Sequence, residues 1–235
     1  MDIKAVLFDL DGTLLPMDQE QFVKMYFGLL AKRLSVRGYE SQKLIDTVMA
    51  GMMAMIKNDG SRSNETVFWN AFVDAYGKEV LNDKEYIDEF YYNEFSGAKV
   101  CCGYAQESRE VIDMLKEKGK MVVLATNPLF PSVATENRMR WAGLEPDDFL
   151  LYTTYEDSYH CKPNPQYYLD ILEKIACRPE ECLMVGNDVT EDMVAETLGM
   201  KVFLLTDCLI NKKNVDISGY PQGGFAELKV YLQDI

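Results

Sequence analysis

Histidine is nearly absent from the sequence, since His160 is the only one among 235 residues. Catalysis by a Ser–His or Cys–His pair is therefore excluded unless this one residue, which lies in a polar stretch, supplies the base. Positive charge is also scarce: 24 lysines and arginines face 38 aspartates and glutamates, for a formal net charge of -14. Nucleic-acid binding surfaces need clustered Lys and Arg, so we expect no nucleic-acid partner.

Long apolar runs are missing too, and none approaches the roughly 20 residues that a membrane-spanning helix needs. Residues 1–4 lead directly into a candidate strand without a signal-peptide segment. We therefore expect no membrane partner and a cytoplasmic location. The six cysteines contain no C-x-x-C pair, which favours reduced thiols that pack as small apolar groups. With 48% apolar residues, the chain can bury a full core, as one large domain or two smaller ones.

Two carboxylates follow the first apolar run of the chain, Ala5 to Phe8, which is typical of a strand buried on both faces of a parallel sheet. Asp9 and Asp11 stand two positions apart, so in an extended chain their side chains face one small volume. Such carboxylates repel each other, and a cation or a shared proton is the usual remedy. Gly12 then permits a sharp turn. Asp-Gly is also an ordinary turn dipeptide, but this order of features favours a functional site.

The next part of the sequence predicts helices only, and no strand. Apolar residues recur there at helical spacing, with Ser41 as a plausible N-cap of the second helix. The expected helices cover 18–34, 41–58, 64–76 and 83–95. We therefore predict a helical domain over residues 16–97, inserted into a core that is formed by residues 1–15 and 98–235.

From about residue 100 onward, helical and strand patterns alternate, which is typical of a parallel sheet with crossover helices. The expected helices cover 106–118, 131–141, 165–177, 191–198 and 225–232, and the expected strands cover 121–125, 149–153, 182–185 and 201–205. The predicted fold class is therefore α/β, with a doubly wound, Rossmann-like parallel sheet. Ligands bind such sheets beyond the carboxyl ends of the strands.

Polar residues stand at several of these strand ends. Thr126 and Asn127 follow the strand over 121–125, where a hydroxyl and free backbone N–H groups suit a phosphate oxygen, although similar residues are common in loops. Lys162 precedes Pro163, which biases it toward an extended conformation and makes it more than a solvated surface charge. The turn after the strand over 182–185 carries further carboxylates, which on their own favour simple stabilisation of a helix N-terminus.

These segments, in this order, resemble the four motifs of the haloacid dehalogenase-like hydrolases, most of which are Mg²⁺-dependent phosphatases. The resemblance extends from Asp9 to Asp192, with the helical segment in the place of the family's first type of cap. It implies that Asp9 is a nucleophile that forms an aspartyl-phosphate, and that Asp11 is the general acid and base. It also implies that Lys162 steadies the nucleophile and the phosphate.

The resemblance further implies phosphate binding by Thr126 and Asn127, and a Mg²⁺ site in the same place. Candidate metal ligands are the carboxylates of Asp9, Asp188 and Asp192 and a backbone carbonyl near Asp11. This sequence departs from the family at Asn187, where many members have aspartate directly after the glycine. Whether Asn187, Asp188 or Asp192 reaches the metal therefore stays open.

The expected function is a Mg²⁺-dependent phosphomonoester hydrolase that acts on a small phosphorylated metabolite, as a monomer or homodimer. Arg62, in a polar loop of the helical domain, is either part of a solvated turn or a contact to the non-phosphate end of the substrate. A phosphomutase would keep the same residues, whereas Asp11 argues against a dehalogenase and against enzymes that cleave C–P bonds. A silent binding protein on this fold would be expected to have lost Asp9 or Lys162.

Overall fold

The computed structural model describes residues 2–235 and contains one six-stranded sheet with the strand order β3-β2-β1-β4-β5-β6. Each neighbouring pair of strands is parallel. The strands are β1 (Ala5–Phe8), β2 (Met121–Leu124), β3 (Leu151–Tyr152), β4 (Cys182–Gly186), β5 (Lys201–Leu205) and β6 (Gln222–Gly223). Since β1 lies in the middle, the residues that follow it are placed at the centre of the sheet's carboxyl edge.

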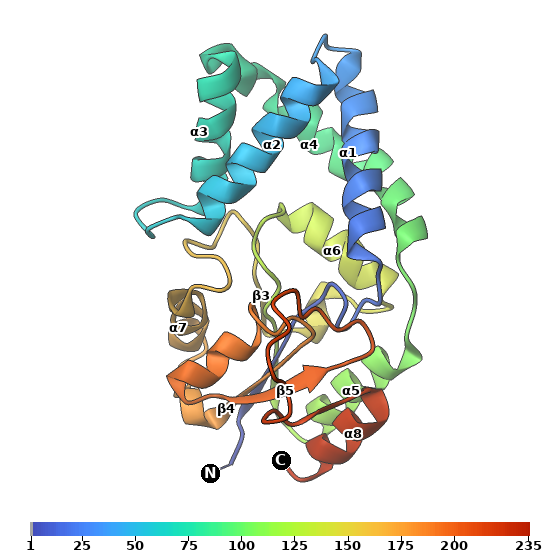
Figure 1. Cartoon of the computed structure of the whole chain (residues 1–235), viewed down its shortest axis with the longest axis vertical. Coiled ribbons are helices and arrows are strands. Elements are labelled where there is room, and N and C mark those ends of the chain that lie inside the picture. Colours follow the sequence, from blue (N-terminus) through green and yellow to red (C-terminus); the bar gives the residue numbers. More distant parts are fainter. Residues whose placement is uncertain (1) are drawn as a thin grey trace.

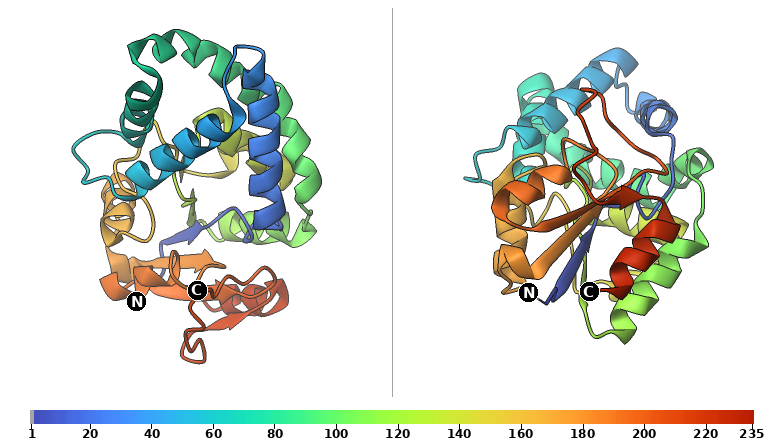
Figure 2. Two further views of the ribbon diagram at one scale, coloured as in Figure 1. Left: turned by 45° about the horizontal axis from the view of Figure 1, so that its top comes forward. Right: turned by 60° about the horizontal axis from the view of Figure 1, so that its bottom comes forward.

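Helices cover both faces of this sheet, as Figure 2 shows in its right-hand view. Val6 and Phe8 of β1 are buried in one apolar cluster, while Ala5 and Leu7 are buried in a second cluster on the opposite face. The first cluster includes residues of α5 (Gln106–Glu117), α6 (Ser132–Trp141) and α8 (Phe225–Gln233), and the second includes residues of α7 (Pro165–Lys174). Burial on both faces explains the uninterrupted apolar run of β1 and confirms the doubly wound α/β fold.

The segment between β1 and α5 contains helices only and lies beyond the carboxyl edge of the sheet (Figure 1). It consists of α1 (Gln19–Ser35), α2 (Ser41–Ile56), α3 (Asn64–Tyr76) and α4 (Lys84–Tyr92), with 3₁₀ helices at Lys78–Asp83 and Glu94–Cys101. We call residues 17–101 the helical region. The chain enters and leaves it side by side, since the N–H of Gly103 donates to the carbonyl of Pro16 at 2.7 Å. The domain boundaries at residues 15 and 97 stay a prediction.

Several elements differ from the expectation. The second long helix has Glu40 rather than Ser41 as its N-cap, because the Glu40 carboxylate reaches two backbone N–H groups, at 2.9 and 2.7 Å. The helix expected over 191–198 is a turn followed by a 3₁₀ helix, Met193–Leu198. The strand β5 is not the last one, because β6 pairs with it through two residues, which are too few for a periodic pattern.

A membrane-spanning helix is not found among residues 2–235, because none of their helices combines the required length with sufficient apolar character. This finding agrees with the absence of long apolar runs in the sequence.

Asn64, the first residue of α3, joins the helical region to loops at the carboxyl edge of the sheet. Its side chain is fully buried, and its amide nitrogen lies 3.4 Å from the carbonyl oxygens of Pro128 and His160 and 3.2 Å from Cys161 Sγ. Its amide oxygen accepts a hydrogen bond from Asn58 at 2.8 Å. One side chain therefore satisfies groups from both parts of the molecule.

We expect Asn64→Ala to lower the free energy of unfolding by about 1–3 kcal/mol, because buried partners lose their hydrogen bonds. Asn70→Ala is the matched control, since Asn70 lies on the same helix but is exposed. Urea unfolding followed by circular dichroism measures both changes. Equal, small losses for the two variants would contradict a joining role of Asn64.

Candidate active site

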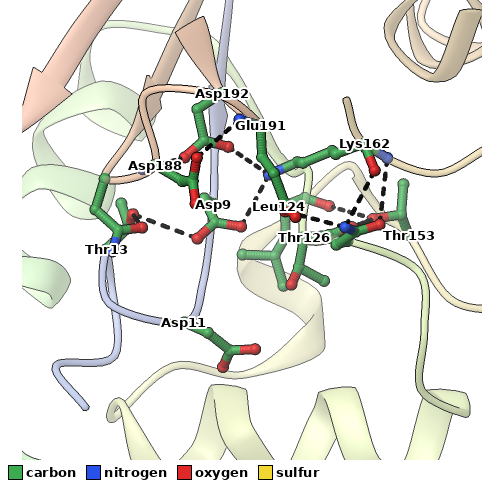
Figure 3. Close-up of polar contacts among 12 residues, drawn as sticks. Asp9, Asp11, Thr13, Leu124, Thr126, Thr153, Lys162, Asp188, Glu191 and Asp192 are labelled. Atoms are coloured by element: carbon green, nitrogen blue, oxygen red, sulfur yellow. Dashed lines mark hydrogen bonds and ion pairs between the residues drawn. The ribbon is translucent and has the colours of Figure 1, made fainter. Parts of the chain in front are cut away.

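A buried lysine connects two carboxylates at the carboxyl edge of the sheet (Figure 3). Lys162 Nζ lies 2.9 Å from Asp9 Oδ1 and 2.7 Å from Asp192 Oδ1, and the lysine side chain is 0% exposed. Burial by itself would lower the pKa of this lysine, but Asp192 and Asp9 outweigh burial and raise the pKa well above its usual value. The side chain is therefore an ammonium ion at neutral pH. The three residues come from three segments that meet only in the folded chain.

The backbone of Lys162 is held in place by Asn127, which follows β2. Asn127 Oδ1 accepts the Lys162 N–H at 3.2 Å, and Asn127 Nδ2 lies 3.4 Å from the Lys162 carbonyl oxygen. The helix after this segment begins at Pro165, with the side chain of Asn164 accepting the Gln166 N–H. Asn164 is thus the N-cap of α7. The amide of Asn127, which we expected to bind phosphate, here orients the lysine segment.

Thr126 lies two residues beyond the end of β2 and is 2% exposed. Its carbonyl oxygen accepts hydrogen bonds from the hydroxyls of Thr153 at 2.6 Å and Tyr167 at 2.9 Å. These two bonds fix the backbone at the end of β2. The expectation that Thr126 binds phosphate stays a prediction.

A second group of contacts surrounds the other oxygen of Asp9. The hydroxyl of Thr13 lies 3.4 Å from Asp9 Oδ2 and 3.1 Å from Asn187 Oδ1. Because this hydroxyl has only one hydrogen, it can donate to only one of the two oxygens at a time. Asn187 Nδ2 donates to the carbonyl of Cys208 at 2.7 Å, which turns the amide oxygen toward Thr13. Gly12 has φ +86°, and a Cβ at this residue would lie only 2.2 Å from Asn187 Nδ2. Glycine is therefore required both for the turn and for the space.

The carboxylates of the loop after β4 are already engaged in this structure. Asp188 Oδ1 accepts the N–H groups of Thr190 at 2.7 Å and Glu191 at 2.9 Å, within the turn that precedes the 3₁₀ helix Met193–Leu198. Asp192 Oδ2 accepts the Asp188 N–H at 2.9 Å while its other oxygen binds Lys162. Residues 2–235 contain no group of three or more His, Cys, Asp and Glu side chains that could hold a metal ion. Asp9 and Asp192 are nevertheless brought together through Lys162, and metal binding by Asp9, Asp188 and Asp192 stays a prediction.

Asp11 departs from the expectation that it shares one small volume with Asp9. Its carboxylate points away from Asp9 in Figure 3, and its Oδ2 forms an ion pair with Arg138 of α6. The side chains diverge because the residues after β1 leave the extended conformation: the N–H groups of Thr13 and Leu15 both donate to the carbonyl of Leu10. Arg138 was not identified from the sequence, because nothing in the pattern of its helix indicates a partner 127 residues away.

Glu191 is a second residue of the site that sequence analysis missed. Its Oε2 accepts a hydrogen bond from Asn127 Nδ2 at 3.0 Å, and burial raises its pKa from 4.5 to about 7. Its position between Asp188 and Asp192, two candidate metal ligands, is the feature of the sequence that could have indicated its place in the site. Arg62, by contrast, is exposed, and its backbone carbonyl accepts from Asn58 at 2.8 Å. A contact between Arg62 and a substrate stays a prediction.

Comparison with known proteins agrees with this geometry. A family model described as haloacid dehalogenase-like hydrolase matches residues 3–195. The chain belongs to this family. It is thus a hydrolase, and the resemblance of its four motifs to those of the haloacid dehalogenase-like hydrolases is confirmed.

Individual members of the family differ in activity. A pyrophosphatase, PpaX of Bacillus mycoides, is 25% identical over 208 residues, which are 86% of this chain and 82% of the relative. The crystal structure of a phosphatase from Thermococcus onnurineus has a TM-score of 0.60 at 19% identity and 98% coverage of both chains. That of a 2-haloacid dehalogenase from Pseudomonas syringae has a TM-score of 0.64 at 20% identity and 99% coverage of both. At these identities the two crystal structures support the fold only.

The raised pKa of Glu191 predicts a pH dependence of stability for this haloacid dehalogenase-like hydrolase. With a folded-state pKa of about 7 against an ordinary 4.5, the folded protein binds more protons than the unfolded chain between these values. Stability should therefore fall as pH rises through this window. Glu191→Gln cannot lose a proton, so its melting temperature should exceed that of the wild type at pH 8, with a smaller gap at pH 5.

Thermal denaturation of the metal-free protein at pH 5, 6, 7 and 8 measures this difference. Glu196→Gln is the control, because Glu196 is exposed and lies in the same part of the chain. Parallel curves for Glu191→Gln and the wild type across the pH range would show that the Glu191 carboxylate is not the responsible group.

Proposed function

We propose that the protein is a Mg²⁺-dependent phosphomonoester hydrolase that acts through an aspartyl-phosphate on Asp9. The observation that carries the proposal is the Lys162 ammonium, buried and 2.9 Å from Asp9. A carboxylate that attacks a phosphate must overcome repulsion between negative charges, and a fixed cation beside it lowers that barrier. In a chain of net charge -14, such local positive charge is what can receive a phosphorylated substrate.

The reaction would proceed in two displacements. Asp9 attacks phosphorus and the alcohol leaves, with a proton supplied by Asp11; water then attacks the aspartyl-phosphate after Asp11 takes its proton. Lys162 holds Asp9 and an oxygen of the phosphate during both steps. Asn127 keeps the lysine segment in position through its two contacts with the Lys162 backbone.

The oxygen atoms around Thr13 fit a hard cation. Asp9 Oδ2 and Asn187 Oδ1 both lie near a single hydroxyl, which has only one hydrogen to share between them. Carboxylate, amide and backbone oxygens are ligands that suit Mg²⁺ and Ca²⁺. We therefore assign Asp9 and Asn187 as the residues that would hold the cation. Asp188 directly follows Asn187 in the chain. When bound, the cation would neutralise phosphate charge and polarise the phosphoryl group.

A hollow of about 590 Å³ gives a small molecule access to this side of the site. It is lined by Asn187, by residues at the start of α1 and by residues 208–212. Hollows of this size commonly bind small organic ligands. Because PpaX of Bacillus mycoides is a pyrophosphatase, inorganic pyrophosphate belongs in the substrate panel together with sugar, alkyl and aryl phosphates.

The purified protein should release phosphate from an aryl phosphate in the presence of Mg²⁺ and lose this activity in excess chelator. Asp9→Asn should reduce turnover to background with an unchanged circular dichroism spectrum, because the amide cannot form the covalent bond. Mass spectrometry after acid quenching should find phosphate on Asp9; phosphate on another residue would refute the assignment. Phosphoryl transfer within a sugar phosphate with little free phosphate would instead indicate the phosphomutase alternative.

The metal assignment leads to a separate prediction. Asn187→Asp should tighten Mg²⁺ binding by about tenfold, because it adds a negative charge beside Asp9. Asp188→Asn should preserve the hydrogen bonds from the Thr190 and Glu191 N–H groups, because an amide oxygen also accepts them. Since it removes a negative charge, it should weaken Mg²⁺ binding. Isothermal titration of Mg²⁺ into the protein without substrate measures both. If Asp188→Asn has no effect while Asn187→Ala abolishes binding, Asn187 alone is the ligand from this loop.

A further inference from the structure

The side chain of Asn127 joins two segments of the candidate active site. Its Oδ1 accepts the Lys162 N–H at 3.2 Å, and its Nδ2 lies 3.0 Å from Glu191 Oε2 and 3.4 Å from the Lys162 carbonyl oxygen. An amide carries two hydrogens on its nitrogen and none on its oxygen, so these contacts use both of its ends. Because Lys162 Nζ is paired with Asp9, the contacts continue to the proposed nucleophile.

The orientation of this amide is set by its neighbours. Turned over in the same space, Nδ2 would face the Lys162 N–H, donor against donor, and Oδ1 would face Glu191. An ionised carboxylate only accepts hydrogen bonds, so Glu191 attracts the amide nitrogen and repels the amide oxygen. Hydrogen bonds to an ionised group are roughly twice as strong as neutral ones, so Glu191 favours the observed orientation more strongly than the Lys162 N–H does.

Glu191 is itself fixed by neighbours on two sides. Its N–H donates to Asp188 Oδ1 at 2.9 Å, and its carbonyl accepts the Tyr168 hydroxyl at 2.8 Å. Tyr168 lies on α7 and is 0% exposed. A residue whose backbone is held in this way can orient a partner with little freedom of its own. Burial raises the pKa of Glu191 to about 7, so the side chain is mostly ionised at pH 8.

We propose that Glu191 is a positioning residue that acts on Lys162 through Asn127. The inference rests on the proposed function, in which Lys162 holds Asp9 and an oxygen of the phosphate. By keeping the Asn127 oxygen turned toward the Lys162 N–H, Glu191 fixes the backbone from which the lysine reaches Asp9. This position matters for the attack on phosphorus, because a displacement of about 1 Å in an active site can cost about 100-fold in rate.

The competing explanation is that Glu191 only fastens the turn after β4 to the segment after β2. Its loss would then change the melting temperature but leave the folded protein with its normal kcat. A positioning role predicts instead that kcat falls and that the Lys162 N–H exchanges faster with solvent. It also predicts that a variant that keeps an acceptor oxygen at residue 191 is spared.

The kinetic test measures kcat for an aryl phosphate at pH 8 and saturating Mg²⁺. Glu191→Met should lower kcat by about 10–100-fold. Glu191→Gln removes the same charge, but its amide oxygen still accepts from Asn127, so kcat should fall by a few-fold at most. The double variant Glu191→Met with Asn127→Ala should be no slower than Asn127→Ala alone, because both changes remove one function. Glu196→Met is the matched control, since Glu196 is exposed.

Hydrogen exchange of the Lys162 backbone N–H gives a second readout that needs no substrate. Followed by NMR on the folded protein, this N–H should be protected in the wild type and in Glu191→Gln, and should exchange faster in Glu191→Met. If Glu191→Met fails to fold, Glu191→Asp keeps the charge on a shorter side chain, and it should show a smaller loss of both kcat and protection.

Three results would overturn the inference: unchanged exchange in Glu191→Met, equal kcat for the Gln and Met variants, or losses that multiply in the double variant. Failure of the wild type to release phosphate from any ester would instead refute the proposed function. The exchange rates would then still decide whether Glu191 holds the lysine segment.

Discussion

The ammonium of Lys162 between Asp9 and Asp192 is the interaction on which the carboxyl edge of the sheet depends. A buried lysine is strongly unfavourable unless it is paired, and pairing with two carboxylates requires that three chain segments end at one point. A parallel sheet provides this, because the carboxyl ends of its strands meet at one edge. Asp9 follows β1 and Asp192 follows the neighbouring β4, while Lys162 arrives on the segment before α7.

The other hydrogen bonds of the site help to hold Lys162 and its two carboxylate partners together. Asn127 holds the backbone of Lys162, and Asp192 divides its two oxygens between the lysine and the Asp188 N–H. Each residue thus aligns a charged group and also fixes a loop. On the far side of Asp9, Thr13 and Asn187 keep oxygen atoms together without a lysine, which is the arrangement that a cation would suit. One face of Asp9 is therefore neutralised by the protein, and the other is the face at which we propose that the cation binds.

The sequence allowed prediction of those features that depend on local pattern. The apolar run of β1 and the proline beside Lys162 have direct local consequences, so a strand buried on both faces and a lysine that is more than a solvated surface charge could be predicted. The direction of the Asp11 side chain depends on the turn after β1 and on the ion pair with Arg138, 127 residues away, and no local pattern indicates such a partner. The strand β6 was not predicted for another reason: its two residues pair through their backbone and carry no periodicity.

The helical region is connected to the lysine segment as well as to the chain on either side of it. Asn64 at the start of α3 contacts the carbonyl of His160 and the sulfur of Cys161, the two residues that precede Lys162. The N–H of Asn64 also donates to the Ser158 carbonyl at 2.8 Å. A displacement of α3 must therefore break these buried bonds or carry the segment with it, and a carried segment would move Lys162 relative to Asp9. Because broken bonds of this kind are costly when no water replaces them, the position of the helical region and the geometry of the ion pair are physically coupled.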